Sequence, residues 1–95
     1  MNSDIILWLN SNEQAIVELI KPLLKQKEEA VNTYDNLFHD EIINQFESLA
    51  LSIIGIEVCK SLGCSVEDYY ETIQDEIVYN YITNKIFEGE QNDQD

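Results

Sequence analysis

Helical spacing of apolar residues dominates this chain, and little interrupts it. The 95 residues include only three glycines and one proline. No Asn-Gly or Asp-Gly pair of the kind that closes a β-hairpin occurs. Apolar side chains instead recur at intervals of three and four residues, which predicts amphipathic helices. We therefore expect an all-α fold, a small bundle of three main helices with a short additional helix at the N-terminus.

The N-terminal third is expected to form the short helix over residues 3–10 and then the first long helix. Ser11 is a candidate N-cap of the long helix, and one apolar face continues from there for about five turns. Pro22 lies inside this stretch, where a proline removes one main-chain hydrogen bond. The helix is therefore either kinked or divided at Pro22, and the unbroken apolar face favours a kink.

The second long helix is predicted over residues 40–62 and ends at Gly63, a typical residue just past a helix end. Turn-forming side chains between residues 32 and 40 predict a break before it, with Leu37 and Phe38 filling the core at this corner. The helix is apolar around more than half of its circumference, which predicts burial on nearly all sides. Small side chains along one line would let one neighbouring helix approach closely: Ser48, Ser52, Gly55 and Cys59.

The last helix is predicted over residues 66–87, capped by Ser65 and stopped by Gly89. One apolar face comprises Val66, Tyr69, Tyr70, Ile73, Ile77 and Tyr81. A second apolar line points roughly the opposite way and comprises Val78, Tyr79, Ile82 and Ile86. Either the N-terminal helix covers this second line with Trp8 and Leu9, or a second copy of the chain does, in which case the line is an oligomer interface.

A chain of this length forms one domain. We assign residues 1–87 to a single helical domain. Residues 88–95 contain no apolar side chain and four carboxylates, and we expect them to form a disordered acidic tail.

Net charge restricts the partners that such a protein can bind. Nineteen acidic residues stand against five basic ones, for a net charge of −14. This charge disfavours direct binding to nucleic acid and to anionic membranes, and it favours fast association with basic protein surfaces. The sharpest candidate for a partner-binding face is a group of carboxylates on the last helix: Glu67, Asp68, Glu71, Asp75 and Glu76.

In an unbroken helix, Glu67, Glu71 and Asp75 lie on one face and about 6 Å apart along the axis. That spacing is similar to the spacing of successive phosphates on a nucleic-acid strand. A solvated face that only keeps the protein soluble is the alternative interpretation of the same pattern.

Nothing in the sequence predicts catalysis, a cofactor or a metal site. His39 is the only histidine and has no second ligand at metal-binding spacing. Cys59 and Cys64 lack a second pair, although a disulfide between them stays open. No phosphate-binding loop or hydrolase motif occurs, so we expect a protein that is not an enzyme.

We expect a cytoplasmic location. No signal peptide is visible, and the longest apolar stretch, residues 49–59, is shorter than the ~20 residues of a membrane span.

These observations give two functional hypotheses. The first is a small acidic protein that binds and blocks a basic partner surface, most concretely by imitating nucleic acid and inhibiting a nucleic-acid-binding protein, as small phage and mobile-element inhibitors do. The alternative is a homo-oligomeric structural or regulatory subunit joined through the last helix at Val78, Tyr79, Ile82 and Ile86.

Overall fold

The computed structural model describes residues 3–87, apart from the side chains of residues 35–37, and this part of the chain is helical almost throughout. Its elements are α1 (Ser3–Ser11), α2 (Glu13–Leu62), α3 (Val66–Ile73), α4 (Glu76–Tyr81) and the π-helix η1 (Ile82–Phe87). The described residues contain no strand, so the all-α prediction is confirmed. The predicted acidic tail, residues 88–95, lies outside the described residues.

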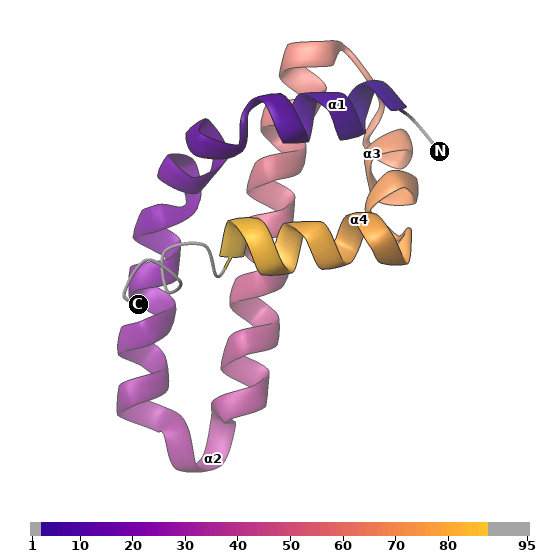
Figure 1. The fold of residues 1–95 in the computed structure, drawn as a ribbon. Helices are drawn as coiled ribbons and strands as arrows, with labels where there is room; N and C mark the ends of the chain where they lie inside the picture. The colour runs from indigo at the N-terminus through magenta and orange to yellow at the C-terminus, as the bar shows by residue number, and fades with distance from the viewer. Residues whose placement is uncertain (1–2, 88–95) are drawn as a thin grey trace.

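Helix α2 is a helical hairpin with two arms that run in opposite directions (Figure 1). Two residues leave helical geometry at its tip, Tyr34 with φ −119° and ψ 21° and Phe38 with φ −125° and ψ 18°. We call residues 13–33 the first arm and residues 39–62 the second arm. The predicted break between residues 32 and 40 is confirmed. The prediction that Phe38 fills the core there is wrong, because its side chain is exposed.

The first arm is continuous through Pro22, so the proline does not divide the helix. Pro22 and Glu18 are both exposed. The carbonyl group of Glu18, which loses its main-chain donor to the proline ring, therefore lies on the solvent side of the helix, where water can bind it.

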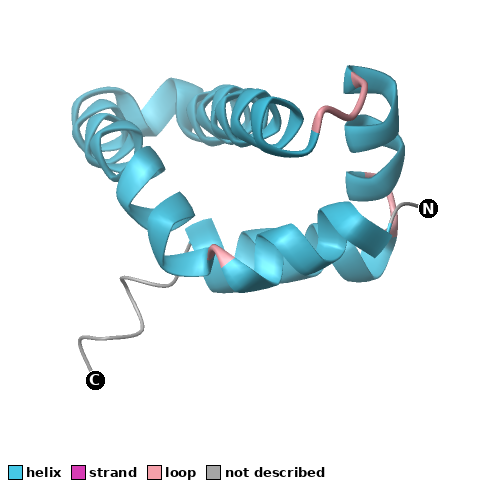
Figure 2. Ribbon diagram, turned by 90° about the horizontal axis from the view of Figure 1, so that it is seen from above, coloured by secondary structure: helices cyan, strands magenta, loops and turns pink. Residues whose placement is uncertain are grey.

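The other helices cross the hairpin. Figure 1 shows α1 lying across its open end, and α4 with η1 crossing the second arm and ending between the two arms. From above, the elements enclose one central region (Figure 2). A single core fills it, built by α1, both arms, α3, α4 and η1: Ile5, Leu9, Ile16, Ile20, Ala50, Ile54, Val58, Tyr69, Ile73, Val78, Ile82, Ile86 and Phe87. The phenol of Tyr81 adds a polar contact, since it donates a hydrogen bond of 2.8 Å to the carboxylate of Glu13 at the start of α2.

The last helix is not continuous as predicted, because α3 ends at Ile73 and α4 begins at Glu76. Asp75 between them has extended geometry, φ −62° and ψ 129°, and caps α4: its carboxylate accepts hydrogen bonds from the main-chain N–H groups of Ile77 at 3.0 Å and Val78 at 3.4 Å. The two predicted apolar lines of residues 66–87 point in opposite directions, so they could not both face one core from a straight helix. The break between α3 and α4 removes this conflict. Ile77, predicted on the first face, is 79% exposed.

Both ends of the connection between α2 and α3 follow the sequence signals. Gly63 takes the left-handed conformation, φ 71°, and donates its N–H to the carbonyl group of Cys59 at 2.8 Å. That conformation costs glycine little, because it has no β-carbon. The hydroxyl of Ser65 then accepts the N–H of Asp68 at 3.0 Å, which satisfies one of the unpaired donors at the start of α3.

Candidate interaction surface

The five carboxylates of the predicted partner-binding face divide into two groups. Glu67, Asp68 and Glu71 are exposed on α3, and helical spacing places them on neighbouring parts of its circumference. We call these three residues the acidic face. Asp75 and Glu76 follow the break, so the five do not form the straight row that an unbroken helix would give.

Asp75 has a structural role that the sequence analysis missed. Its side chain is half-buried and holds the first turn of α4 through the two hydrogen bonds described above. A signal for this role is present in the sequence, since an aspartate followed by an acidic residue is a common helix start. Glu76 is exposed in the first turn of α4, where a negative charge suits the helix dipole.

Beside the acidic face lies a groove between the second arm and α3. It is a cavity of about 330 Å³, and it is walled by small and apolar side chains and one lysine: Ser52, Gly55, Ile56, Cys59, Lys60, Val66, Tyr69 and Tyr70. We call it the α2–α3 groove. Val66 is 61% and Ile56 60% exposed at its edges. Such exposed apolar side chains around a concavity are typical of interaction sites.

The floor of the groove is held by Tyr69 and Tyr70. The phenol of Tyr69 donates a hydrogen bond of 2.6 Å to the main-chain carbonyl group of Leu51. Its ring meets that of Tyr70 edge to face, with centroids 5.2 Å apart, and the hydroxyls of Tyr70 and Ser52 lie 3.2 Å apart. The line of small residues noted in the sequence therefore has its close neighbour, which is α3.

Helical geometry joins the groove to the acidic face. Around the circumference of α3, Glu67 lies next to Val66, and Glu71 lies next to Tyr70. Both carboxylates are on the side of the helix that faces away from the core. The surface thus has an apolar centre and a carboxylate rim on one side. An apolar centre with a polar rim is the usual anatomy of a protein–protein interface.

A second exposed apolar surface runs along the second arm, and it corrects the prediction that this helix is buried on nearly all sides. Leu49 is 49% exposed, and Ile42 and Ile56 lie on the same side at helical spacing. Phe38 at the hairpin tip lines the same hollow as Ile42, and Ile56 joins this surface to the edge of the α2–α3 groove. We call these four residues the outer face. By length and composition alone, the segment Phe38–Leu62 could cross a membrane. Only 22% of its most apolar stretch is buried inside the protein. The second arm therefore has more apolar side chains than the core of the described chain buries.

The predicted oligomer interface lies mostly inside the chain. Val78, Ile82 and Ile86 are buried in the same core as Ile5 and Leu9 of α1, and Trp8 packs against that core. Tyr79 is 38% exposed at the edge of this core, and its partial burial and the nearby negative charge of Glu47 raise its pKa. Of the two explanations left open by the sequence, cover from within the chain accounts for these residues.

The two cysteines and the histidine form no metal centre within residues 3–87, where no cluster of three or more metal-binding side chains occurs. Cys59 and Cys64 are free thiols with their Sγ atoms 3.8 Å apart. Burial and the contact with Cys59 raise the pKa of the Cys64 thiol. His39 is exposed at the start of the second arm.

Comparison of the chain with protein-family models, with curated proteins and with solved structures finds no match in any of the three.

Proposed function

We propose that this chain is an acidic interaction protein that docks on a basic partner surface through the α2–α3 groove and the acidic face, and thereby blocks that surface. What supports the proposal is the position of exposed Val66 and Tyr70 directly beside Glu67 and Glu71. The apolar part gains free energy when it is covered, at roughly 25 cal/mol per Å². The carboxylates add orientation and a faster encounter.

The chemistry of this surface defines the partner. It is a protein that presents an apolar side chain among lysines and arginines. A nucleic-acid-binding protein is the most concrete case, because its phosphate-binding site offers such groups. The net charge of −14 steers the chain to such a site and away from nucleic acid itself. The free thiols of Cys59 and Cys64 suit the reducing cytoplasm, which we propose as its location.

Affinity capture from a lysate of the source organism tests this proposal. The acidic-face variant carries Glu67→Lys, Asp68→Lys and Glu71→Lys, all at exposed positions. We expect the wild-type chain to capture a basic protein at low salt and much less of it at high salt, because salt screens exposed charges. The acidic-face variant should capture none.

The matched control reverses three exposed carboxylates on the first arm, Glu18→Lys, Glu28→Lys and Glu29→Lys. It changes the net charge by the same amount at a different place, so it should still capture the partner. Equal loss in both variants would mean that net charge alone acts and would refute a defined docking face. Blocking is tested by competition: DNA or RNA bound to the captured protein should be displaced by the wild-type chain.

A homodimer is a second candidate function, and the outer face favours it. Because Val78, Ile82 and Ile86 are buried within the chain, we move the proposed contact from the last helix to Phe38, Leu49 and Ile56. Sedimentation at micromolar concentration should then give a dimer that Leu49→Glu converts to a monomer. A wild-type monomer would exclude this candidate and leave the acidic docking proposal intact.

A further inference from the structure

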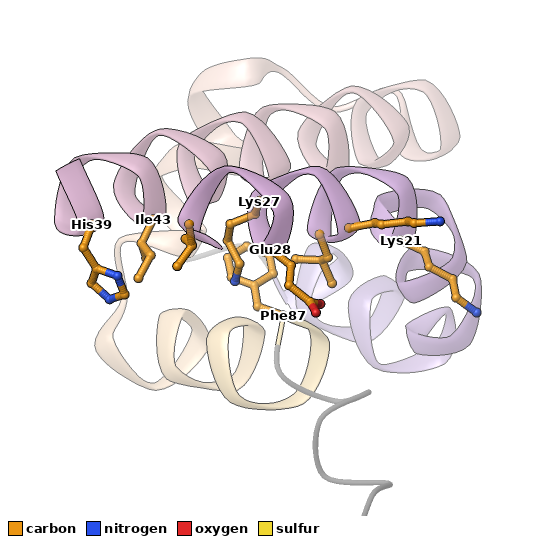
Figure 3. A pocket seen from close by; sticks show the side chains of 9 residues that line it. Lys21, Lys27, Glu28, His39, Ile43 and Phe87 are labelled. Atoms are coloured by element: carbon orange, nitrogen blue, oxygen red, sulfur yellow. The ribbon is translucent and has the colours of Figure 1, made fainter. Parts of the chain in front are cut away.

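The described part of the chain has another concave site, separate from the α2–α3 groove. It is a cavity of about 450 Å³ between the first arm, the start of the second arm and the end of η1 (Figure 3). Its walls combine charged and apolar side chains: Lys21, Leu24, Lys25, Lys27, Glu28, Val31, His39, Ile43 and Phe87. This volume lies within the range of small-molecule sites.

The charge of this cavity differs from that of the protein. Three of the five basic residues of the chain line it, Lys21, Lys25 and Lys27, against one carboxylate, Glu28. These four side chains sum to a charge of +2, in a chain whose net charge is −14. The two other lysines, Lys60 and Lys85, lie outside the cavity lining. An anion is therefore attracted to this place and repelled by most of the remaining surface.

The walls also have an apolar part. On the first arm, Leu24 and Val31 are seven residues apart and share one side of the helix. By the same geometry, Lys27 lies on one flank of this apolar line, and Lys21 and Lys25 lie on the other. Ile43 of the second arm and the buried Phe87 of η1 complete the apolar walls. Figure 3 shows Lys27 and Glu28 extending from the first arm toward Phe87.

We propose that this cavity binds a small anion with an apolar body, such as a medium-chain fatty acid. The hydrocarbon would lie on Leu24, Val31, Ile43 and Phe87, and a lysine ammonium group on one flank of this apolar line would hold the carboxylate. An apolar floor binds hydrocarbon without direction, and a few charged groups at the edge fix the orientation. The single anionic group matches a lining whose excess positive charge is small. This site does not depend on the proposed docking function.

The test is a ¹H–¹⁵N NMR titration of the full chain with decanoate below its micelle concentration, and with decanol as an uncharged ligand of equal chain length. Shift changes with decanoate should concentrate at Lys21–Val31, His39–Ile43 and Phe87. Decanol should bind about tenfold more weakly, because it lacks the charge. Shift changes confined to the α2–α3 groove, or equal affinity for both ligands, would overturn the proposal.

A lysine variant separates the charge from the shape of the cavity. Lys21→Gln, Lys25→Gln and Lys27→Gln keep good helix formers in the first arm, so a circular dichroism spectrum like that of the wild type is expected. The affinity for decanoate should fall about tenfold, the effect of one lost charge contact, while the affinity for decanol should not change.

The matched control is Lys60→Gln with Lys85→Gln, which removes positive charge outside the cavity lining. It should bind decanoate as tightly as the wild-type chain does. An equal loss of affinity in the control and in the lysine variant would contradict a site at this cavity.

Discussion

The ring of Tyr69 rests directly on the backbone of Gly55, so closely that a β-carbon on residue 55 would lie 2.5 Å from Cε2 of the ring. This contact attaches α3 to the second arm and forms the floor of the α2–α3 groove. Because the Tyr69 phenol also donates a hydrogen bond to the carbonyl group of Leu51, the ring cannot move aside without losing this partly buried bond. The position of the acidic face relative to the groove therefore depends on this pair.

Replacing Gly55 by alanine should destabilise the fold. Overpacking against Tyr69 costs about 1–3 kcal/mol, and the better helix propensity of alanine returns up to about 1 kcal/mol. We expect the free energy of unfolding in urea to fall by up to about 2 kcal/mol. Ser52→Ala, one turn away in the same groove, loses the exposed hydroxyl contact with Tyr70 but gains helix propensity, so it should change the free energy of unfolding by less than about 0.5 kcal/mol. A Gly55→Ala chain more stable than the wild type would contradict the described contact.

Asp75 offers a test of the break between α3 and α4. Asp75→Ala should lower the free energy of unfolding by about 1 kcal/mol, the usual cost of a lost N-cap. Asp75→Asn removes the same charge but keeps an oxygen that accepts the N–H groups, so it should lose only a few tenths. Equal stability of the alanine and asparagine variants in thermal unfolding would show that the carboxylate does not cap α4.

The raised pKa values of the Tyr69 and Tyr81 phenols predict that the protein loses stability in alkali. Burial raises the pKa of both, and for Tyr81, with the added hydrogen bond to Glu13, to about 12. An unfolded tyrosine ionises near pH 10. Below that pH both states hold the proton. Above it the unfolded state releases the proton first, so stability falls as pH rises from about 10 to 12. Tyr81→Phe should make this decline shallower in urea unfolding at each pH, and an unchanged slope would contradict the assignment.

The Cys64 thiol should react slowly with alkylating agents, and the two thiols of Cys59 and Cys64 should react readily with each other. Since the thiolate is the reactive form, the raised pKa of Cys64 predicts slower reaction with iodoacetamide at pH 7 than for a free cysteine. Diamide should take one hydrogen from each thiol and leave an intrachain disulfide, because the Sγ atoms are only 3.8 Å apart. Mass spectrometry checks both, and disulfide-linked dimers forming before the intrachain bond would contradict this geometry.

Local signals in the sequence were sufficient for much of the fold. Gly63 and Ser65 mark the end of α2 and the start of α3 by their own chemistry, and the polar cluster between residues 32 and 40 marks the hairpin tip. Each signal acts within a few residues, so no knowledge of distant contacts is needed to interpret it. The same holds for the overall helical class.

Properties set by distant contacts were less accessible. The apolar spacing over residues 66–87 is compatible with one helix, and only the position of the core decides that Asp75 caps a new one. Likewise, periodicity shows that the second arm is apolar but not how much of it the rest of the chain can cover. A chain of this size has too few other residues to bury Leu49 and Ile56. The α2–α3 groove, formed by two separate helices, was missed for the same reason.

We propose that the chain acts on its partner through one defined surface, the α2–α3 groove with the acidic face. Isothermal titration calorimetry of the captured partner with the wild-type chain, the acidic-face variant and the first-arm control tests it most directly. We predict that the acidic-face variant binds at least about tenfold more weakly than the wild type, and that the control stays within about twofold of it. An acidic-face variant that binds within about twofold of the wild type would contradict the claim.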